Sequence, residues 1–463
     1  MNNENKKGVA VHAKKTKSHV VVKDREKTFL SDGEIIPNKV AVNDDDSYEH
    51  KEPPIDELKN ANYESEIEKI KAKCKYKQEY VDDKVILSVN HLKQYFYFGH
   101  GPNRFKLKAV HDVSFKVHEG ECFGLVGESG CGKTTTGRSI IRLYDITSGS
   151  VYYKGYRIGA GSRWNEKEIK YTKIRFDKQK AELKTLLEEK KITQEEHDEK
   201  LKAAEQLKNN VIRVQKAKIK QIKHDEKHVD SKLMREIQMI FQDPIDSLDP
   251  RMTVETIISE GLQIQGFHNR QENHEKVVAA LKKVGLIEDY CSRYPHEFSG
   301  GQRQRIGIAR ALVMNPKFLI CDEPISALDV SIRAQILNLL NDLKEEMGLS
   351  LIFIAHDLSV VKYFCDRIAV MYFGELVELA SSDELFKHPL HPYTKSLLSA
   401  IPKPNPISEK TRKRITYNPQ EVHDYSVEKP HLHEILPGHF ILANTPEIEK
   451  YNEEIKKLDK EAK

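Results

Sequence analysis

The sequence predicts an α/β fold in which a mainly parallel sheet carries helices on both faces. Three short apolar runs support this prediction, and they lie at Cys122–Val126, Phe318–Cys321 and Leu351–Ala355. Each run has the length of a buried strand, and helical stretches separate the runs along the chain. Buried apolar strands that alternate with helices are typical of parallel sheets, because crossover helices cover the two faces.

The chain before these runs has a different composition. Residues 1–83 are polar and charged, without sustained periodicity. Such a segment buries too little apolar surface to offset the entropy lost on folding, so we predict a disordered or weakly structured N-terminal tail. Further on, Val85–Val89 and Val113–Val117 alternate like half-buried strands. The folded domain is therefore expected to occupy residues 84–380.

A charged helical insertion is predicted between residues 158 and 233, where Lys and Glu are dense. One helical face carries Leu183, Leu186 and Leu187. Residues 193–196 read T-x-x-E, a capping box that would start a second helix. The apolar residues that follow at roughly heptad spacing are Val211, Val214, Ile219 and Ile222. We interpret the segment as a helical hairpin, and leave open whether it binds a partner or is a solvated pair of charged helices.

The composition and charge of the chain exclude several classes of function. The chain has 75 Lys and Arg against 71 Asp and Glu, a net charge of +4 that is too weak to indicate nucleic-acid binding. No run approaches the roughly 20 apolar residues of a membrane span, and the first residues lack the apolar core of a secretory signal. We therefore expect a soluble chain that meets a membrane only through a partner. The six cysteines are Cys74, Cys122, Cys131, Cys291, Cys321 and Cys365, and no pair has the C-x-x-C spacing of a zinc site or redox motif. Two of them lie inside the motifs described below, where a disulfide would be harmful, so a reducing compartment fits best.

A phosphate-binding loop follows the first apolar run. Residues 127–134 read GESGCGKT and match G-x-x-x-x-G-K-[ST] completely. Glycines let the backbone wrap around phosphate, Lys133 can reach the β- and γ-phosphates, and the Thr134 hydroxyl can ligate Mg²⁺. The positive end of the following helix would face the phosphates. The predicted phosphate-binding residues are Gly127, Glu128, Ser129, Gly130, Cys131, Gly132, Lys133, Thr134 and Thr135.

Two carboxylates end the second apolar run. Asp322 and Glu323 directly follow Phe318–Cys321. Asp322 is expected to hold Mg²⁺, directly or through water. Glu323 is placed to orient or activate the attacking water, which makes it the predicted catalytic carboxylate.

With these motifs the sequence resembles the ATP-binding-cassette family over residues 85–380. Residues 298–302 read FSGGQ, one substitution from the family's LSGGQ signature. The resemblance implies a RecA-like P-loop ATPase core with a helical signature subdomain over 245–310. It also implies that the start of the signature helix binds the γ-phosphate of an ATP held by an opposite subunit. The residues concerned are Ser299, Gly300, Gly301 and Gln302.

Further positions match the family in order along the chain. Gln242 matches the glutamine that contacts Mg²⁺ or the water, and Asp329 matches the loop at the dimer seam. His356 follows a strand, as does the histidine that contacts the γ-phosphate. Phe96, or the adjacent Tyr95, resembles the aromatic residue that stacks on adenine. The resemblance thus implies three catalytic residues (Glu323, His356, Gln242), three Mg²⁺ ligands (Thr134, Gln242, Asp322), and ATP as cofactor.

Two segments resemble the oligopeptide/dipeptide importer branch of this family. One is GESGCGKTTTGR around the phosphate loop, and the other is HPLHPYT at residues 388–394, which opens a C-terminal extension over 381–463. Glu434–His439 resembles the end of that extension. We expect the extension to have a structural role without a part in catalysis. No cysteine follows Cys365, so we expect no iron–sulfur cluster there.

The resemblance implies a peripheral subunit at the cytoplasmic face of the cell membrane that hydrolyses ATP to energise oligopeptide uptake. The implied partners are a second homologous ATPase in a heterodimer, two integral permease subunits and, indirectly, an extracellular peptide-binding lipoprotein. Two alternatives stay open. The cargo could be another small solute, such as nickel or glycosides. The chain could also be a soluble interaction protein that ATP switches, with the helices of 158–233 as its binding surface.

Overall fold

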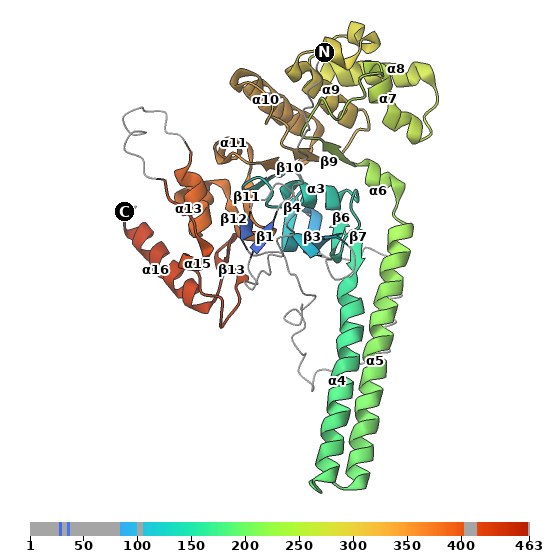
Figure 1. The fold of residues 1–463 in the computed structure, drawn as a ribbon. Helices are drawn as coiled ribbons and strands as arrows, with labels where there is room; N and C mark the ends of the chain where they lie inside the picture. The colour runs from blue at the N-terminus through green and yellow to red at the C-terminus, as the bar shows by residue number, and fades with distance from the viewer. Residues whose placement is uncertain (1–26, 30–34, 38–83, 100–104, 402–413, 462–463) are drawn as a thin grey trace, which may run out of the picture. The chain divides into compact units, whose positions relative to one another are not determined.

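The computed structural model describes residues 27–29, 35–37, 84–99, 105–401 and 414–461 (Figure 1). The chain divides into two compact units, residues 1–45 with 97–107 and residues 46–96 with 108–463. In the first, β1 (Lys27–Phe29) pairs antiparallel with β2 (Ile35–Pro37). Apart from these two strands, the predicted N-terminal tail lies outside the described residues.

An eight-stranded sheet forms the centre of the second unit, in the order β13-β14-β12-β11-β5-β10-β9-β8. Its five parallel strands are β5 (Cys122–Val126), β8 (Ile237–Ile240), β9 (Phe318–Asp322), β10 (Ser350–Ala355) and β11 (Arg367–Tyr372). Its antiparallel strands are β12 (Glu375–Ser381), β13 (His431–Leu436) and β14 (His439–Ala443). The three apolar runs are confirmed as adjacent central strands, since Leu351 of β10 lies opposite both Cys122 of β5 and Leu319 of β9.

A second sheet corrects the predicted layering. Its order is β4-β3-β6-β7, and its strands are β3 (Val85–Phe98), β4 (Phe105–His118), β6 (Ser148–Tyr153) and β7 (Tyr156–Ser162). Val89 and Val113 of this sheet share a buried cluster with Ile320 and Ile352 of the parallel sheet. One face of the parallel sheet is therefore covered by this sheet together with α3 (Lys133–Ile140), rather than by helices alone. The predicted alternation is confirmed for Val113–Val117, where every second residue is buried. It is wrong for Val85–Val89, because Ile86–Val89 are all buried.

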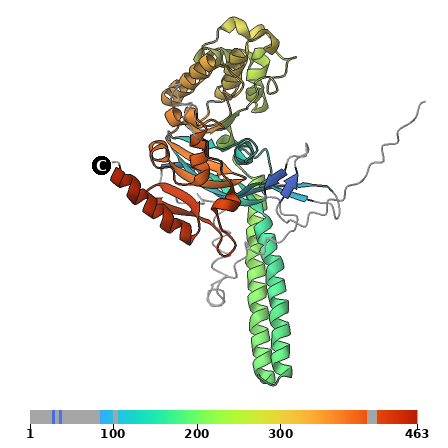
Figure 2. The ribbon, with the colours of Figure 1, turned by 60° about the vertical axis from the view of Figure 1, so that its left-hand side comes forward.

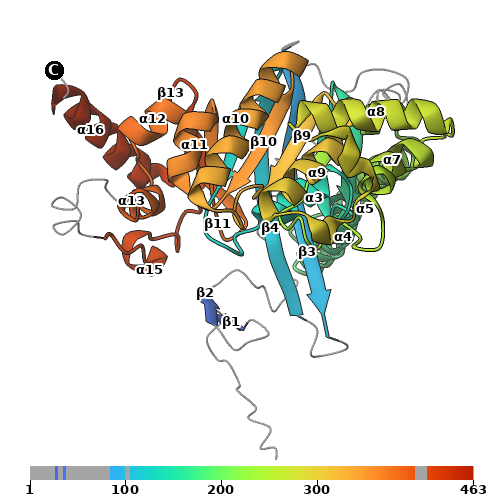
Figure 3. The ribbon, with the colours of Figure 1, turned by 90° about the horizontal axis from the view of Figure 1, so that it is seen from above.

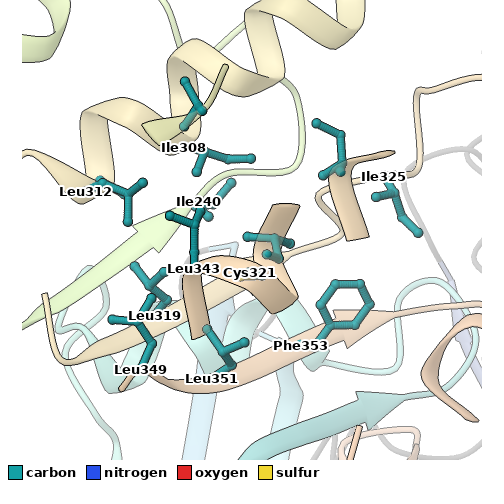
Figure 4. Close-up of a cluster of buried hydrophobic side chains, with 14 of the residues drawn as sticks. Ile240, Ile308, Leu312, Leu319, Cys321, Ile325, Leu343, Leu349, Leu351 and Phe353 are labelled. Atoms are coloured by element: carbon teal, nitrogen blue, oxygen red, sulfur yellow. The ribbon is translucent and has the colours of Figure 1, made fainter. Parts of the chain in front are cut away.

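Helices cover the opposite face. Leu319, Cys321, Leu351 and Phe353 point into a cluster with side chains of two helices, including Ile308 and Leu343 (Figure 4). These helices are α9 (Gly300–Leu312) and α10 (Val330–Met347), which with α11 (Leu358–Phe364) lie beside the strands in Figure 3. Because alternate strand residues point to opposite faces, each central strand serves both clusters.

The segment predicted as a helical subdomain over 245–310 contains three packed helices. Val277 and Leu281 pack with Ile257 and Ile306 in the larger cluster. The elements are α7 (Val254–Ile264), α8 (Arg270–Lys283), two 3₁₀ turns at Glu288–Ser292 and Pro295–Glu297, and α9. The helix α9 thereby links this subdomain to the parallel sheet.

The predicted helical hairpin consists of α4 (Arg163–Glu188) and α5 (Gln194–Lys227), which run side by side in Figures 1 and 2. The helix α6 (Ser231–Arg235) leads from it to β8. The capping box is formed, because the Thr193 hydroxyl accepts the Glu196 N–H at 3.2 Å and the Thr193 N–H donates to the Glu196 carboxylate at 3.0 Å. The hairpin begins at Arg163 rather than at residue 158, because Tyr156–Ser162 pairs with β6.

The C-terminal extension continues the main sheet, since β14 pairs with β12. Its helices are α12 (Ser382–Lys387), α13 (Pro392–Ser399), α15 (Pro419–Val422) and α16 (Thr445–Glu461). Glu378 of β12 and His439 of β14 are fully buried and 2.9 Å apart. Within the described residues, no helix combines the length and apolar character needed to cross a bilayer.

Candidate functional site

The phosphate loop connects β5 to α3, and two of its glycines are required by geometry. Gly127 and Gly132 have φ of +151° and +104°, where other residues are strained. A Cβ at Gly127 would lie 2.1 Å from the Met371 carbonyl oxygen, and one at Gly132 would lie 2.2 Å from that of Ala109. The close approach of neighbouring backbone therefore requires both glycines of the motif, in addition to any requirement set by a phosphate ligand.

Lys133 fills the inside of this loop. Its side chain is buried, and Nζ donates to the carbonyl oxygens of Gly127 and Glu128 at 2.8 Å each. Nζ also lies 3.8 Å from the Cys131 sulfur, and burial raises the pKa of that thiol, so it stays uncharged. Thr134 and Thr135 follow in the first turn of α3. An ammonium group beside a helix N-terminus is suited to bind a phosphate anion.

Asp322 lies at the end of β9, opposite the first turn of α3. The Thr134 hydroxyl donates to its Oδ1 at 2.7 Å, whereas Oδ2 is buried without a hydrogen-bond partner in the described part of the chain. Burial raises the pKa of Asp322, and the hydrogen bond from Thr134 opposes that shift. A buried unsatisfied carboxylate oxygen is costly, so the pair fits a divalent cation that supplies the missing partner.

The described residues contain no group of three or more His, Cys, Asp or Glu side chains that could hold a metal alone.

Glu323 is held between two side chains from other parts of the chain. Its Oε2 accepts the Gln242 amide at 3.1 Å and lies 3.2 Å from His356 Nδ1. The residue has φ of +44°, an uncommon value outside glycine. The three predicted catalytic residues therefore meet at one carboxylate oxygen, next to a small cavity lined also by Ser326 and Arg333.

Ser299 begins α9 and forms a second capping box. Its hydroxyl accepts the Gln302 N–H at 3.4 Å, and its N–H donates to the Gln302 side chain at 3.0 Å. A Cβ at Gly301 would lie 2.7 Å from Ile332 of α10, so glycine is needed for this packing. Phe298 is buried, whereas Ser299 and Gly300 are exposed. These residues interact with one another and with α10, and they present an exposed helix N-terminus.

Two other predicted residues are also accessible. Asp329 is the exposed N-cap residue of α10 and is followed by Val330, whose side chain is 80% exposed. Phe96 is half-buried, with its ring edge-on to Tyr144 at 5.3 Å between centroids. The alternative aromatic, Tyr95, is buried, so Phe96 is the better placed of the two to stack on a base.

One contact of the phosphate loop was missed by sequence reasoning. The N–H of Glu128 donates to the hydroxyl oxygen of Tyr393 at 3.0 Å. Tyr393 belongs to HPLHPYT, for which the sequence suggested only a structural role. A tyrosine that is almost fully buried needs a partner for its hydroxyl, but this burial is known only from the structure, so the sequence carried no signal for the contact.

The phosphate loop after β5, the paired carboxylates at the end of β9 and the capped signature helix define a P-loop ATP-binding cassette. A model of the ABC transporter family matches residues 110–224 and 204–326, two matches that overlap within α5. A model of the oligopeptide/dipeptide transporter C-terminal region matches residues 377–429. The chain belongs to the ABC transporter family, and its activity is that of an ABC-type ATPase.

Curated relatives match most of this chain and nearly all of their own length. The oligopeptide transport ATP-binding protein OppF of Bacillus subtilis is 46% identical over 79% of this chain and 99% of its own. The corresponding protein AmiF of Streptococcus pneumoniae is 45% identical over 76% and 94%. The dipeptide transport ATP-binding protein DppF of Lactococcus lactis is 42% identical over 74% and 90%.

Proposed function

We propose that this chain hydrolyses ATP to energise oligopeptide uptake, as a peripheral subunit at the cytoplasmic face of the membrane. The observation that carries the peptide assignment is the pairing of relatives named for oligopeptide transport with a match to the transporter C-terminal region. Its partners would be a second, homologous ATPase and two integral permease subunits, with a peptide-binding lipoprotein outside the cell.

The phosphate loop would bind the triphosphate of ATP through its backbone N–H groups and Lys133. Thr134, Asp322 and Gln242 would hold Mg²⁺, and the bound cation supplies positive charge beside the phosphates. Among the described residues, the hydrogen-bond partners of Lys133 Nζ are two loop carbonyl oxygens and the Cys131 sulfur, which it can exchange for phosphate oxygens. Phe96 would stack on the adenine.

Glu323 is the proposed catalytic carboxylate. Gln242 and His356 both hold its Oε2, which leaves Oε1 to accept a hydrogen bond from the attacking water. A carboxylate fixed in this way positions the water and can take its proton as the bond to the γ-phosphorus forms. His356, which is half-exposed, would in addition reach the γ-phosphate.

The second half of each site would come from the signature of the partner ATPase. In this chain, Ser299–Gln302 would serve the ATP held by the partner, and Asp329 would lie at the seam. The Ser299 hydroxyl uses a lone pair to accept the Gln302 N–H, so its own hydrogen remains available to a phosphate oxygen. Exposure of Ser299, Asp329 and Val330 supports such a seam.

Replacing Ser299 with alanine tests this half-site. Loss of the cap should lower the free energy of unfolding by about 1 kcal/mol, and loss of the phosphate donor should lower ATP turnover several-fold. The matched control is Thr193→Ala, which removes the equivalent capping box in the hairpin. Both losses are measured by urea unfolding and phosphate release. Equal turnover in the two variants would assign Ser299 a purely structural role.

Affinity purification of the tagged chain from solubilised membranes tests the transporter assignment. Integral permease subunits and a second cassette protein should co-purify. Uptake of labelled oligopeptides should depend on the chain, while uptake of nickel or glycosides should not. Recovery with cytosolic proteins alone would instead support an ATP-switched interaction protein that binds through α4 and α5.

A further inference from the structure

We propose that Tyr393 is a positioning residue through which the C-terminal extension holds the phosphate loop ready for ATP. The proposal rests on ATP binding by that loop. It assigns to the segment HPLHPYT a part in setting ATP affinity, beyond closing the fold.

The contact joins the start of the loop to α13. The Tyr393 hydroxyl oxygen accepts the Glu128 N–H at 3.0 Å, and the side chain is only 1% exposed. Burial raises the pKa of Tyr393, so the hydroxyl stays neutral and retains its lone pairs for the amide. The hydroxyl is buried whereas Glu128 is exposed, so the hydrogen bond ties a peptide group of the exposed loop to a buried side chain.

Glu128 is held on both sides of its backbone. Tyr393 holds the N–H, and Lys133 Nζ holds the carbonyl oxygen at 2.8 Å. Without the tyrosine hydroxyl, the peptide between Gly127 and Glu128 could rotate. That rotation would displace the Gly127 carbonyl oxygen, one of the two that orient the Lys133 ammonium. The hydroxyl therefore acts on the phosphate-binding lysine through one intervening residue.

The position of Tyr393 is itself fixed by a buried network. Its N–H donates to His391 Nδ1 at 3.1 Å, and the His391 N–H donates to Glu378 at 3.1 Å. Glu378 also accepts the Leu390 N–H at 2.8 Å, and lies 2.9 Å from His439 Nε2. Glu378 belongs to β12 and His439 to β14, so strands on both sides of the boundary of the extension hold the turn before α13.

Aromatic packing adds a second restraint and provides a matched control. The ring of Tyr393 lies 4.4 Å from that of Tyr372 and 5.5 Å from that of Tyr417. Tyr417 also packs against Tyr372, with ring centroids 5.2 Å apart. Tyr417 thus belongs to the same aromatic cluster as Tyr393, but the hydroxyl that accepts the hydrogen bond from the phosphate loop is that of Tyr393.

The test replaces Tyr393 with phenylalanine in the full-length chain, with Tyr417→Phe as the control. Tyr393→Phe keeps the ring and removes one hydrogen bond. Since one such bond contributes about 0.5–1.5 kcal/mol, ATP should bind roughly two- to tenfold more weakly, with KM raised to match and kcat unchanged. Tyr417→Phe should bind ATP like the parent chain. Binding is measured with a fluorescent ATP analogue and turnover by phosphate release.

Hydrogen exchange provides a readout that does not depend on turnover. In the nucleotide-free chain, the Glu128 amide should exchange faster in Tyr393→Phe than in the parent, while amides of β10 should be unchanged. Equal ATP affinity and equal exchange at Glu128 would overturn the proposal, as would the same loss in both phenylalanine variants. A parent chain that fails to bind ATP would instead overturn the function on which the proposal rests.

Discussion

Replacing Glu323 with glutamine is expected to lower ATP turnover by about 100- to 10,000-fold while leaving ATP affinity within a few-fold of the parent. Glutamine has the shape of glutamate and can keep hydrogen bonds to Gln242 and His356, so the cavity should persist. It cannot accept a proton from water, and that step should fail. Phosphate release measures the loss, and equilibrium binding of labelled ATP measures what is kept.

The control for this variant is Glu346→Gln, which makes the same chemical change at an exposed position on α10. Its turnover should equal that of the parent chain. Undiminished hydrolysis by Glu323→Gln would show that another group activates the water, and His356, which lies beside Glu323, would then be tested next.

Replacing Gly132 with alanine is expected to abolish measurable ATP binding. A Cβ there would lie 2.2 Å from the Ala109 carbonyl oxygen and 3.0 Å from the Met371 methyl carbon, so the loop or β4 must move. Gly132 is also the N-cap residue of α3, and its displacement would carry Lys133 and Thr134 with it. Equilibrium binding and the thermal shift produced by ATP both measure the loss.

Gly120→Ala separates this collision from backbone strain. Gly120 also has positive φ, +73°, but a Cβ there would meet no atom within 4 Å. It should lose about 1 kcal/mol of stability and keep its ATP affinity. Normal ATP binding by Gly132→Ala would contradict the close approach of β4 to the loop.

The strands and the phosphate loop could be predicted because their signals are local. A five-residue apolar run and an eight-residue motif each describe one segment, and β5 with Gly127–Thr134 formed as expected. The order of strands could not be predicted in this way. The strand β10 lies between β5 and β9 although it follows both in sequence, and periodicity carries no information on which buried strands are neighbours.

The errors in layering and in the hairpin boundary have two causes. The same sequence pattern occurs in strands of different sheets, and one strand shows no strand pattern at all. The alternation of Val85–Val89 predicts one buried face, whereas Ile86–Val89 are all buried, and it does not indicate the sheet to which the strand belongs. In β7, Gly159 and Gly161 interrupt the apolar pattern, so the sequence gives no strand signal there and the predicted helical segment begins too early. The hairpin itself was recognisable because Thr193 and Glu196 carry a capping signal within only four residues.

The candidate site also combines features that a local sequence pattern predicts with contacts between distant segments that it does not predict. Gln242 and His356 were predicted from their order along the chain, while their meeting at Glu323 Oε2 required the sheet. The Tyr393 contact was not predictable, because its partner is a backbone N–H group, which every residue except proline carries.

The length of the hairpin formed by α4 and α5 would amplify small rotations at its base. At 1.5 Å per residue, the 34 residues of α5 extend about 51 Å from a base that contacts β7. If the two helices turn as one body, a rotation of about 10° at the base sweeps the tip through about 9 Å. A fluorophore in the turn at residues 189–193 would therefore magnify small rotations of the cassette into displacements that energy transfer resolves.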